Sequence, residues 1–322
     1  MTLLRTSWLS LVLFACVGPI AQAAPAQSSR VQAELLAERT AIVPGQPFTV
    51  GLRMKMDDHW HIYWVNPGDS GLAPNIEWTL PPGFSAGPIH WPAPRRIPTP
   101  PLMTYGYEGE VLLMTEITPP ANLPANSTVK ITANADWLVC DKVCIPGRGE
   151  YPLELPVSGG GTPSSSNDAP LFERTRSSLP IVGGEELNSN FARSGDAFIL
   201  TVELPKGTSV DPAKVYFYPL EGAIVDAAQP QTAHVAEGRL EVRMKRSPNA
   251  EGDPESLRGL LALDSTLPPP YGNRAIAIAA MKTNGISSAN SPASPHKPSA
   301  AVVRRASGEA RLAGEAVRRA AV

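Results

Sequence analysis

Apolar and polar side chains alternate along several short runs, and this pattern restricts the possible folds more than any other feature of the chain. Over residues 48–56 the apolar members recur at every second position, as Phe48, Val50, Leu52, Met54 and Met56. A period of two is that of a β-strand with one buried face. Prolines and glycines, 35 and 26 in the whole chain, fall between such runs, as in residues 66–71. Short strands separated by such turns predict an all-β chain built as a sandwich.

The strand-like runs fall into two blocks, and 322 residues are enough for two domains. The first predicted domain spans residues 24–157, and the second spans residues 170–282. Residues 158–169 between them are rich in glycine and serine and predict a flexible linker. Residues 283–322 show no alternation, and we expect them to form a disordered tail. The second domain has no cysteine and one histidine, so we expect a spacer, docking or scaffold module.

The N-terminal segment, residues 1–23, resembles a secretory signal peptide. Arg5 precedes an apolar stretch over residues 8–20, and Ala21-Gln22-Ala23 then offers a cleavage site of small residues. A glycine and a proline interrupt the stretch, which is shorter than the roughly 20 apolar residues of a membrane span. The sequence therefore predicts export to the periplasm.

The distribution of charge argues against nucleic acid as a partner. The whole chain carries a net charge of −2, although residues 283–322 hold six lysines and arginines against two glutamates. With that +4 and Arg5 set aside, residues 24–282 carry −7. Binding to nucleic-acid phosphates depends on clustered lysine and arginine, so we expect no such partner.

Cys140 and Cys144 are the only cysteines left once the predicted signal peptide is removed. In an extended segment their Cα atoms would lie about 13 Å apart, whereas a disulfide needs about 4.4–6.8 Å. The chain must therefore turn at residues 141–143 for the two sulfurs to bond. Closing so small a loop removes only about 2 kcal/mol of unfolded-state entropy, which favours redox exchange over a structural staple. The residues alone leave three uses open: redox exchange, a staple and metal binding.

The run that leads to the cysteines has two distinct faces. Its odd-numbered positions are apolar and predict a buried face: Val129, Ile131, Ala133, Ala135, Trp137 and Val139. The even-numbered positions, which end at Cys140, share the other and more polar face. Cys140 is thus expected to leave the strand on its polar side, where a partner thiol can reach a sulfur.

Histidines supply further ligands for the metal hypothesis. His59 and His61 have the same strand parity and can face one ion together. Two imidazoles with two thiolates would make a tetrahedral zinc site, or a copper site of another geometry. The alternative is that both histidines occupy exposed or hydrogen-bonded strand positions. The sequence has no haem-attachment motif and no glycine-rich phosphate loop, so no cofactor is expected.

Several motifs in order give the chain a family resemblance. They are His59–Trp64, Asn66–Leu72, Ile76–Trp78, Tyr105–Glu110 and Asp136–Pro146. Together they resemble the periplasmic N-terminal region of DsbD-type thiol:disulfide interchange proteins. The similarity is closer to the branch of suppressor-of-copper-sensitivity membrane proteins, and it extends from residue 30 to about residue 282.

The resemblance implies two immunoglobulin-like antiparallel β-sandwich domains in tandem and a cysteine pair that carries electrons. The pair would be reduced by a membrane-embedded thiol relay and would in turn reduce exported thioredoxin-fold proteins, through a mixed disulfide. It also connects the chain with cytochrome c biogenesis and copper tolerance.

Roles for single residues follow from the same resemblance. Cys144 would bond to the partner and Cys140 would resolve the mixed disulfide. Family members cover the cysteines with an aromatic residue of a loop, for which Tyr105 or Tyr107 is the candidate here. The alternative for both tyrosines is ordinary packing with a hydrogen-bonded hydroxyl. Charged residues that can tune the thiolate character of the pair are Asp136, Asp141 and Lys142.

Relatives usually continue into a membrane domain of several spans, whereas this sequence continues into the low-complexity residues 283–322. We therefore expect an electron carrier that depends on a separate electron source, rather than a catalyst that acts alone. The competing hypothesis is a β-sandwich that binds copper or a partner protein, with His59 and His61 as ligands and the cysteine bridge as a staple.

Overall fold

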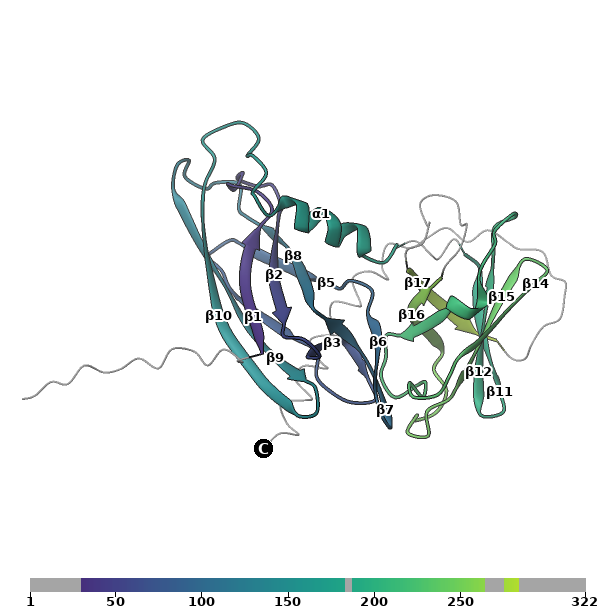
Figure 1. The fold of residues 1–322 in the computed structure, drawn as a ribbon. Helices are drawn as coiled ribbons and strands as arrows, with labels where there is room; N and C mark the ends of the chain where they lie inside the picture. The colour runs from purple at the N-terminus through teal and green to yellow at the C-terminus, as the bar shows by residue number, and fades with distance from the viewer. Residues whose placement is uncertain (1–29, 183–186, 264–274, 284–322) are drawn as a thin grey trace, which may run out of the picture.

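The computed structural model describes residues 30–182, 187–263 and 275–283, and Figure 1 shows that strands predominate in this part of the chain. The predicted signal peptide and residues 284–322 lie outside the described residues. One α-helix, α1 (Ala169–Ser178), occurs in the described part. Over the same residues, no helix has the length and hydropathy needed to cross a membrane.

The first domain consists of two sheets that enclose a common core. One sheet has the order β1-β2-β8-β5, formed by Val31–Ala37, Phe48–Met56, Glu110–Thr118 and Ser85–His90. The other has the order β10-β9-β3-β7-β6, formed by Cys144–Pro156, Thr128–Cys140, His61–Gly68, Leu102–Glu108 and Arg95–Thr99. A further strand, β4 (Asn75–Thr79), pairs with β9. All pairings within these two sheets are antiparallel.

The alternation of side chains explains which face of β9 is buried. The odd-numbered positions predicted to face the core are all buried there: Val129, Ile131, Ala133, Ala135, Trp137 and Val139. On β2, the alternating apolar residues between Phe48 and Met56 join the same core. The period-two pattern therefore predicted both the strands and their buried faces.

Strand β8 is covered on both sides, because helix α1 packs on its outer face. Val111 and Leu113 point into the sandwich core, whereas Leu112 and Met114 contact Phe172 of α1. The helix begins after Asp168 and carries a proline in its first turn, where the missing N–H costs nothing. The guanidinium of Arg176 binds Glu38 of the first domain at 2.9 Å. Helix α1 is therefore attached to the first domain.

The second strand-rich block begins later in the sequence than predicted. Residues from 170 onward were expected to be strand-rich, but Ala169–Ser178 are helical and the first strand of the second domain begins only at Ser189. The N–H of Thr40 donates to the carbonyl of Ser164, and the hydroxyl of Ser166 donates to the carbonyl of Ala37. The later part of the predicted linker is thus hydrogen-bonded to the first domain. Glycine- and serine-rich composition did not reveal these long-range bonds.

The second domain is one seven-stranded sheet with the order β13-β16-β17-β11-β12-β15-β14. Its strands are Tyr216–Pro219, Ser256–Ala262, Ile276–Lys282, Ser189–Ser194, Ala197–Glu203, Arg239–Lys245 and Thr232–Ala236, with a short 3-10 helix at Pro212–Lys214. The two halves of the sheet meet through a short parallel pairing of β11 with β17. Side chains from both halves share one core, including Phe198 and Leu200 from β12 and Leu257 and Ile276 from β16 and β17. The halves therefore pack as a sandwich, as predicted.

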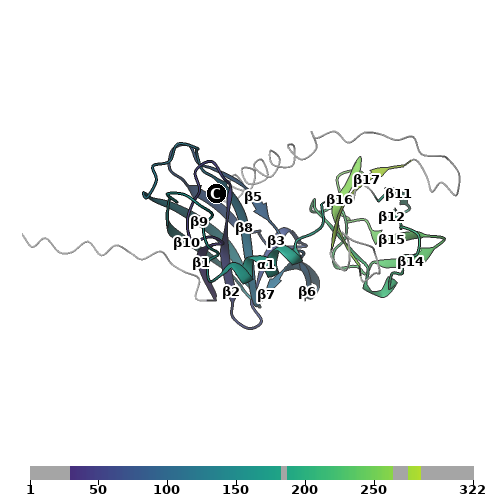
Figure 2. The same cartoon turned by 90° about the horizontal axis from the view of Figure 1, so that it is seen from above.

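An aromatic cluster joins the two domains, which lie side by side in Figures 1 and 2. Tyr105 of β7 contacts Tyr216 and Tyr218 of β13, with ring centroids 6.1 and 5.1 Å away. The hydroxyls of Tyr105 and Tyr216 are hydrogen-bonded at 2.8 Å, and Arg96 lies over the Tyr216 ring. Burial raises the pKa of Tyr218 to about 12, so these phenols remain neutral at physiological pH. The cluster continues the core of the first domain into the second domain.

Candidate redox site

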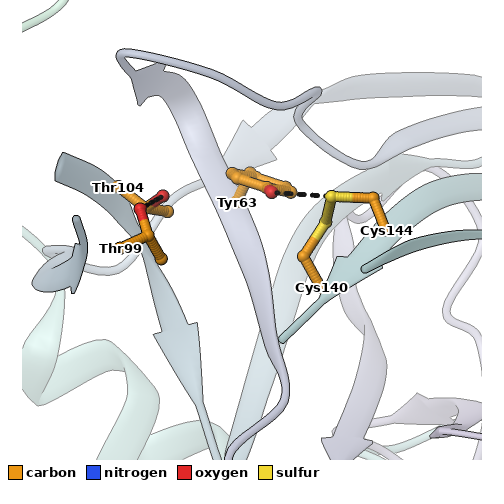
Figure 3. The surroundings of a disulfide bond; sticks show 5 residues. All are labelled: Tyr63, Thr99, Thr104, Cys140 and Cys144. Atoms are coloured by element: carbon orange, nitrogen blue, oxygen red, sulfur yellow. Dashed lines mark hydrogen bonds between the residues drawn. A yellow bond between two sulfur atoms is a disulfide. The ribbon is translucent and has the colours of Figure 1, made fainter. Parts of the chain in front are cut away.

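The hairpin formed by β9 and β10 brings the two cysteines together. The strands pair over their whole length, and Cys140 is the register partner of Cys144 at the hairpin end. The chain turns at residues 141–143, where the N–H of Asp141 donates to the carbonyl of Val143 at 3.2 Å. The Cα atoms of the cysteines are 4.2 Å apart and the sulfurs form a disulfide, as shown in Figure 3. The predicted turn is confirmed.

The two sulfurs differ sharply in their surroundings. Cys140 is only 2% exposed, whereas Cys144 is an exposed residue at the start of β10. Val143, beside it at the hairpin tip, is 62% exposed. Cys140 lies on the polar-facing side of β9, as its parity predicts, yet neighbouring side chains cover it. A partner approaching from solvent therefore meets Cys144 first.

Tyr63 of β3 covers one side of the bridge. Its hydroxyl oxygen lies 3.6 Å from the Sγ of Cys144 (Figure 3). A disulfide sulfur carries no hydrogen, so the hydroxyl is the donor in this contact. Burial raises the pKa of Tyr63, which keeps the phenol protonated and able to donate.

A loop after β3 packs against the Tyr63 ring. The backbone of Gly71 passes so close to the ring that a Cβ at this position would overlap it. Gly71 also has a φ of +112°, which favours glycine. Two bonds hold this region: Asp69 of the loop accepts from the N–H of Met103 of β7, and Asn66, near the end of β3, donates to the carbonyl of Pro219 of the second domain at 2.7 Å. Bonds to β7 and to the second domain thus hold the loop and the strand end from which it leaves.

Gly71→Ala is expected to expose the side of the disulfide that Tyr63 covers. Strain of about 1–3 kcal/mol in the closed loop would raise the population of the displaced loop by roughly 5- to 150-fold, since 1.4 kcal/mol corresponds to a factor of ten. Reduction of the bridge by dithiothreitol should accelerate by a similar factor. Gly109→Ala is the matched control, because Gly109 also has a positive φ but nothing lies near its missing Cβ. Equal rates for the two variants would show that the loop does not restrict access.

His61 lies beside the buried cysteine. It is the first residue of β3, where its register partners are Cys140 on β9 and Glu108 on β7. Its ring meets the Tyr63 ring edge-on, with centroids 5.4 Å apart. The side chain is 2% exposed, and burial lowers the pKa of His61, opposed by the nearby charges of Glu108 and Asp141. His61 is therefore a neutral imidazole at pH 7.

The two tyrosines suggested as covering residues lie elsewhere. Tyr105 and Tyr107 are both buried in the sandwich core, on the opposite face of β7 from Glu108 and Gly106. The hydroxyl of Tyr105 is bonded to Tyr216, and that of Tyr107 donates to the carbonyl of Pro92 at 2.7 Å. This is the packing alternative of the sequence analysis, with hydrogen-bonded hydroxyls. The aromatic residue that contacts the disulfide is Tyr63 instead.

The charged residues predicted to influence the thiolate character of the cysteines lie at different distances from the disulfide. Asp136 accepts a hydrogen bond from Asn75 at 3.1 Å, and it lies four residues before Cys140 on the same strand, about 13 Å away along an extended chain. Lys142 is exposed in the hairpin turn. Asp141 acts on the site through its charge on His61.

The histidines do not share a strand face as the metal hypothesis required. His59 lies in the turn before β3 with a φ of 69°, while His61 is in the strand. Among the described residues, no group of three or more histidines, cysteines, aspartates and glutamates is arranged to hold a metal ion.

Sequence reasoning missed the roles of Tyr63 and His61 at the disulfide. A signal for them was present, because His61 and Tyr63 are two positions apart and so share one strand face. Strand pairing places His61 beside Cys140, which is about 80 positions later in the sequence. The alternation of side chains within a strand does not reveal which strands pair.

Comparisons with known proteins agree with this geometry. Residues 32–156 match the family model described as thiol:disulfide interchange protein DsbD, N-terminal. Among curated proteins, no sequence matches the chain.

Among solved structures, the N-terminal periplasmic domain of ScsB from Proteus mirabilis has a TM-score of 0.52 at 17% sequence identity, over 80% of this chain and 95% of that chain. This likeness shows the fold, and it confirms the prediction of immunoglobulin-like sandwich domains. A protein of unknown function from Porphyromonas gingivalis W83 has a TM-score of only 0.24 at 12% identity, over 78% of this chain and 99% of that chain. A TM-score this low does not indicate a shared fold. Residues 32–156, which contain the disulfide, His61 and Tyr63, therefore resemble the N-terminal domains of DsbD-type thiol:disulfide interchange proteins.

Proposed function

We propose that this protein is a periplasmic electron carrier whose Cys140/Cys144 pair passes electrons from a membrane-embedded thiol relay to an exported thioredoxin-fold protein. The observation that supports the proposal most strongly is the asymmetry of the pair, with Cys144 exposed at a hairpin tip and Cys140 buried. Exchange needs one sulfur that a partner can reach and a second that is kept for resolution.

The position of the bridge also favours exchange over a staple. Strands β9 and β10 are already paired along thirteen register positions, and the bridge closes only the last turn of this hairpin. In the chain-entropy model such a closure contributes about 2 kcal/mol. The domain can therefore remain folded with the pair reduced, as a carrier must.

The reaction proceeds in two exchange steps. In the reduced protein, the thiolate of Cys144 attacks a sulfur of the client disulfide, and the other client sulfur leaves as a thiolate. Cys140 then attacks Cys144, which closes the Cys140–Cys144 bond and releases the second client sulfur. The client gains two electrons and the pair loses two. The relay reverses these steps on the oxidised pair, with its own thiol attacking Cys144.

Electron transfer to a purified, oxidised thioredoxin-fold protein of the periplasm tests this function. Thiols in both proteins are alkylated and counted after mixing. The proposal predicts that one client disulfide is reduced for each Cys140/Cys144 pair oxidised. A bridge that resists reduction and transfers no electrons would instead indicate a binding module with a structural staple.

A further inference from the structure

His61 lies directly opposite Cys140 in the antiparallel pairing of β3 with β9. Side chains of such register partners share one face of the sheet, with Cβ atoms about 4.5–5.5 Å apart. Tyr63, two positions later, is on the same face and contacts both the His61 ring and Cys144. The imidazole, the phenol and the disulfide thus form one cluster on the outer side of β3.

One ring nitrogen of His61 lacks a hydrogen-bond partner. Nε2 is buried and has no partner among the described residues. Most buried polar atoms have a partner, and a redox or catalytic role is one explanation for an exception. In the oxidised pair, Cys140 carries no hydrogen to donate. Reduction gives Cys140 an S–H group, which is a donor on the residue paired with His61.

The charge state of the imidazole suits it to accept a proton. Burial lowers the pKa of His61, while the negative charges of Glu108 on β7 and Asp141 in the hairpin oppose the shift. Tyr63 faces it as a neutral phenol. A neutral imidazole is a base, and the neighbouring carboxylates stabilise the imidazolium that forms when it takes a proton.

We propose that His61 accepts the proton of the Cys140 thiol as Cys140 attacks the mixed disulfide at Cys144. This role rests on the exchange function proposed above. The S–H bond of Cys140 breaks, its proton moves to His61 and its electron pair forms the bond to the Cys144 sulfur. The bond between Cys144 and the client breaks, and the client sulfur leaves with that electron pair. The imidazolium then releases this proton to solvent, and when the relay reduces the pair His61 transfers a proton from solvent to the departing Cys140 thiolate.

The resolving step can be isolated with the aromatic disulfide DTNB on the reduced full chain carrying Cys16→Ser. Cys144 attacks DTNB and releases one thionitrobenzoate, and Cys140 then releases the second in a step whose rate does not depend on DTNB concentration. Absorbance separates the two phases in a stopped-flow instrument. The variants are His61→Gln and His61→Phe, with His90→Gln as the control because His90 is exposed on β5 of the other sheet. Circular dichroism verifies that each variant is folded.

We expect the second phase of both His61 variants to be slower by about a hundredfold at pH 7, as for the loss of a general base. In the wild type and His90→Gln its rate should be nearly constant from pH 7 to pH 8. In the His61 variants it should rise about tenfold per pH unit, because only the ionised thiol then reacts. An unchanged rate, or a slower rate with the wild-type pH profile, would overturn the role of His61. A wild-type protein that releases no second thionitrobenzoate would instead overturn the exchange function itself.

Discussion

Cys140→Ser is expected to accumulate a stable mixed disulfide with its partner, and Cys144→Ser is expected to form none. The exposed Cys144 remains able to attack a client disulfide in the first variant, but no second thiol is present to release the client. In the second variant the remaining thiol belongs to Cys140, which is 2% exposed and is paired with His61. The yields of the trapped complex should differ by more than tenfold, because thiol exchange depends on access to the attacking sulfur.

The measurement is a non-reducing gel of each variant after incubation with an extract of periplasmic proteins, followed by identification of the trapped partner. Both variants carry Cys16→Ser, so that each has a single thiol. The double serine variant is the control for adducts that do not depend on the pair. Equal trapping by both variants, or trapping by Cys144→Ser alone, would contradict the assignment of Cys144 as the partner-facing sulfur.

Tyr105→Ala is expected to destabilise the protein strongly while exchange remains intact. Tyr105 is fully buried between the domains, and its hydroxyl is bonded to that of Tyr216. Truncation of a buried aromatic side chain costs about 3–5 kcal/mol, and the Tyr216 hydroxyl would also lose its hydrogen bond to Tyr105. Tyr105→Phe removes only the hydrogen bond and should cost about 1–3 kcal/mol. Urea unfolding of the purified variants measures both effects.

Leu102→Ala is the matched control for this pair, since Leu102 lies on the same strand and is 40% exposed. It should change the free energy of unfolding by about 0.5 kcal/mol or less. The rate of DTNB exchange at 25 °C should be the same in all three variants. Faster exchange in Tyr105→Ala would mean that this residue covers the cysteines, as the family resemblance suggested, and would contradict the interface described here.

Local patterns in the sequence predicted much of the fold. The alternation from Val129 to Val139 located β9, its buried face and the polar side on which Cys140 lies. The distance argument then required a turn between the cysteines, and the hairpin has one. These inferences succeeded because strand period and chain geometry are set by neighbouring residues.

The surroundings of the disulfide depend on contacts that are distant in sequence. Tyr63 and Cys144 are 81 positions apart, and Tyr105 and Tyr216 are 111 positions apart. Tyr105 and Tyr107 are two positions apart, as core residues of a strand are. This spacing alone is compatible with core packing and with a role in covering the cysteines. Pairing of β3 with β7 and β9 decides between these roles, because it turns His61 toward Cys140 and both tyrosines toward the core. The sequence pattern did not indicate helix α1, because only Phe172 and Thr175 of this helix are buried.

The reduction potential of the Cys140/Cys144 pair tests the central claim most directly. It is measured by equilibrating the protein with glutathione or dithiothreitol buffers and quantifying the reduced fraction by alkylation. A carrier predicts a potential above about −300 mV, in the range of couples that exchange electrons with other proteins. A potential well below that value, with a bridge that no physiological thiol reduces, would show a structural disulfide and contradict the account.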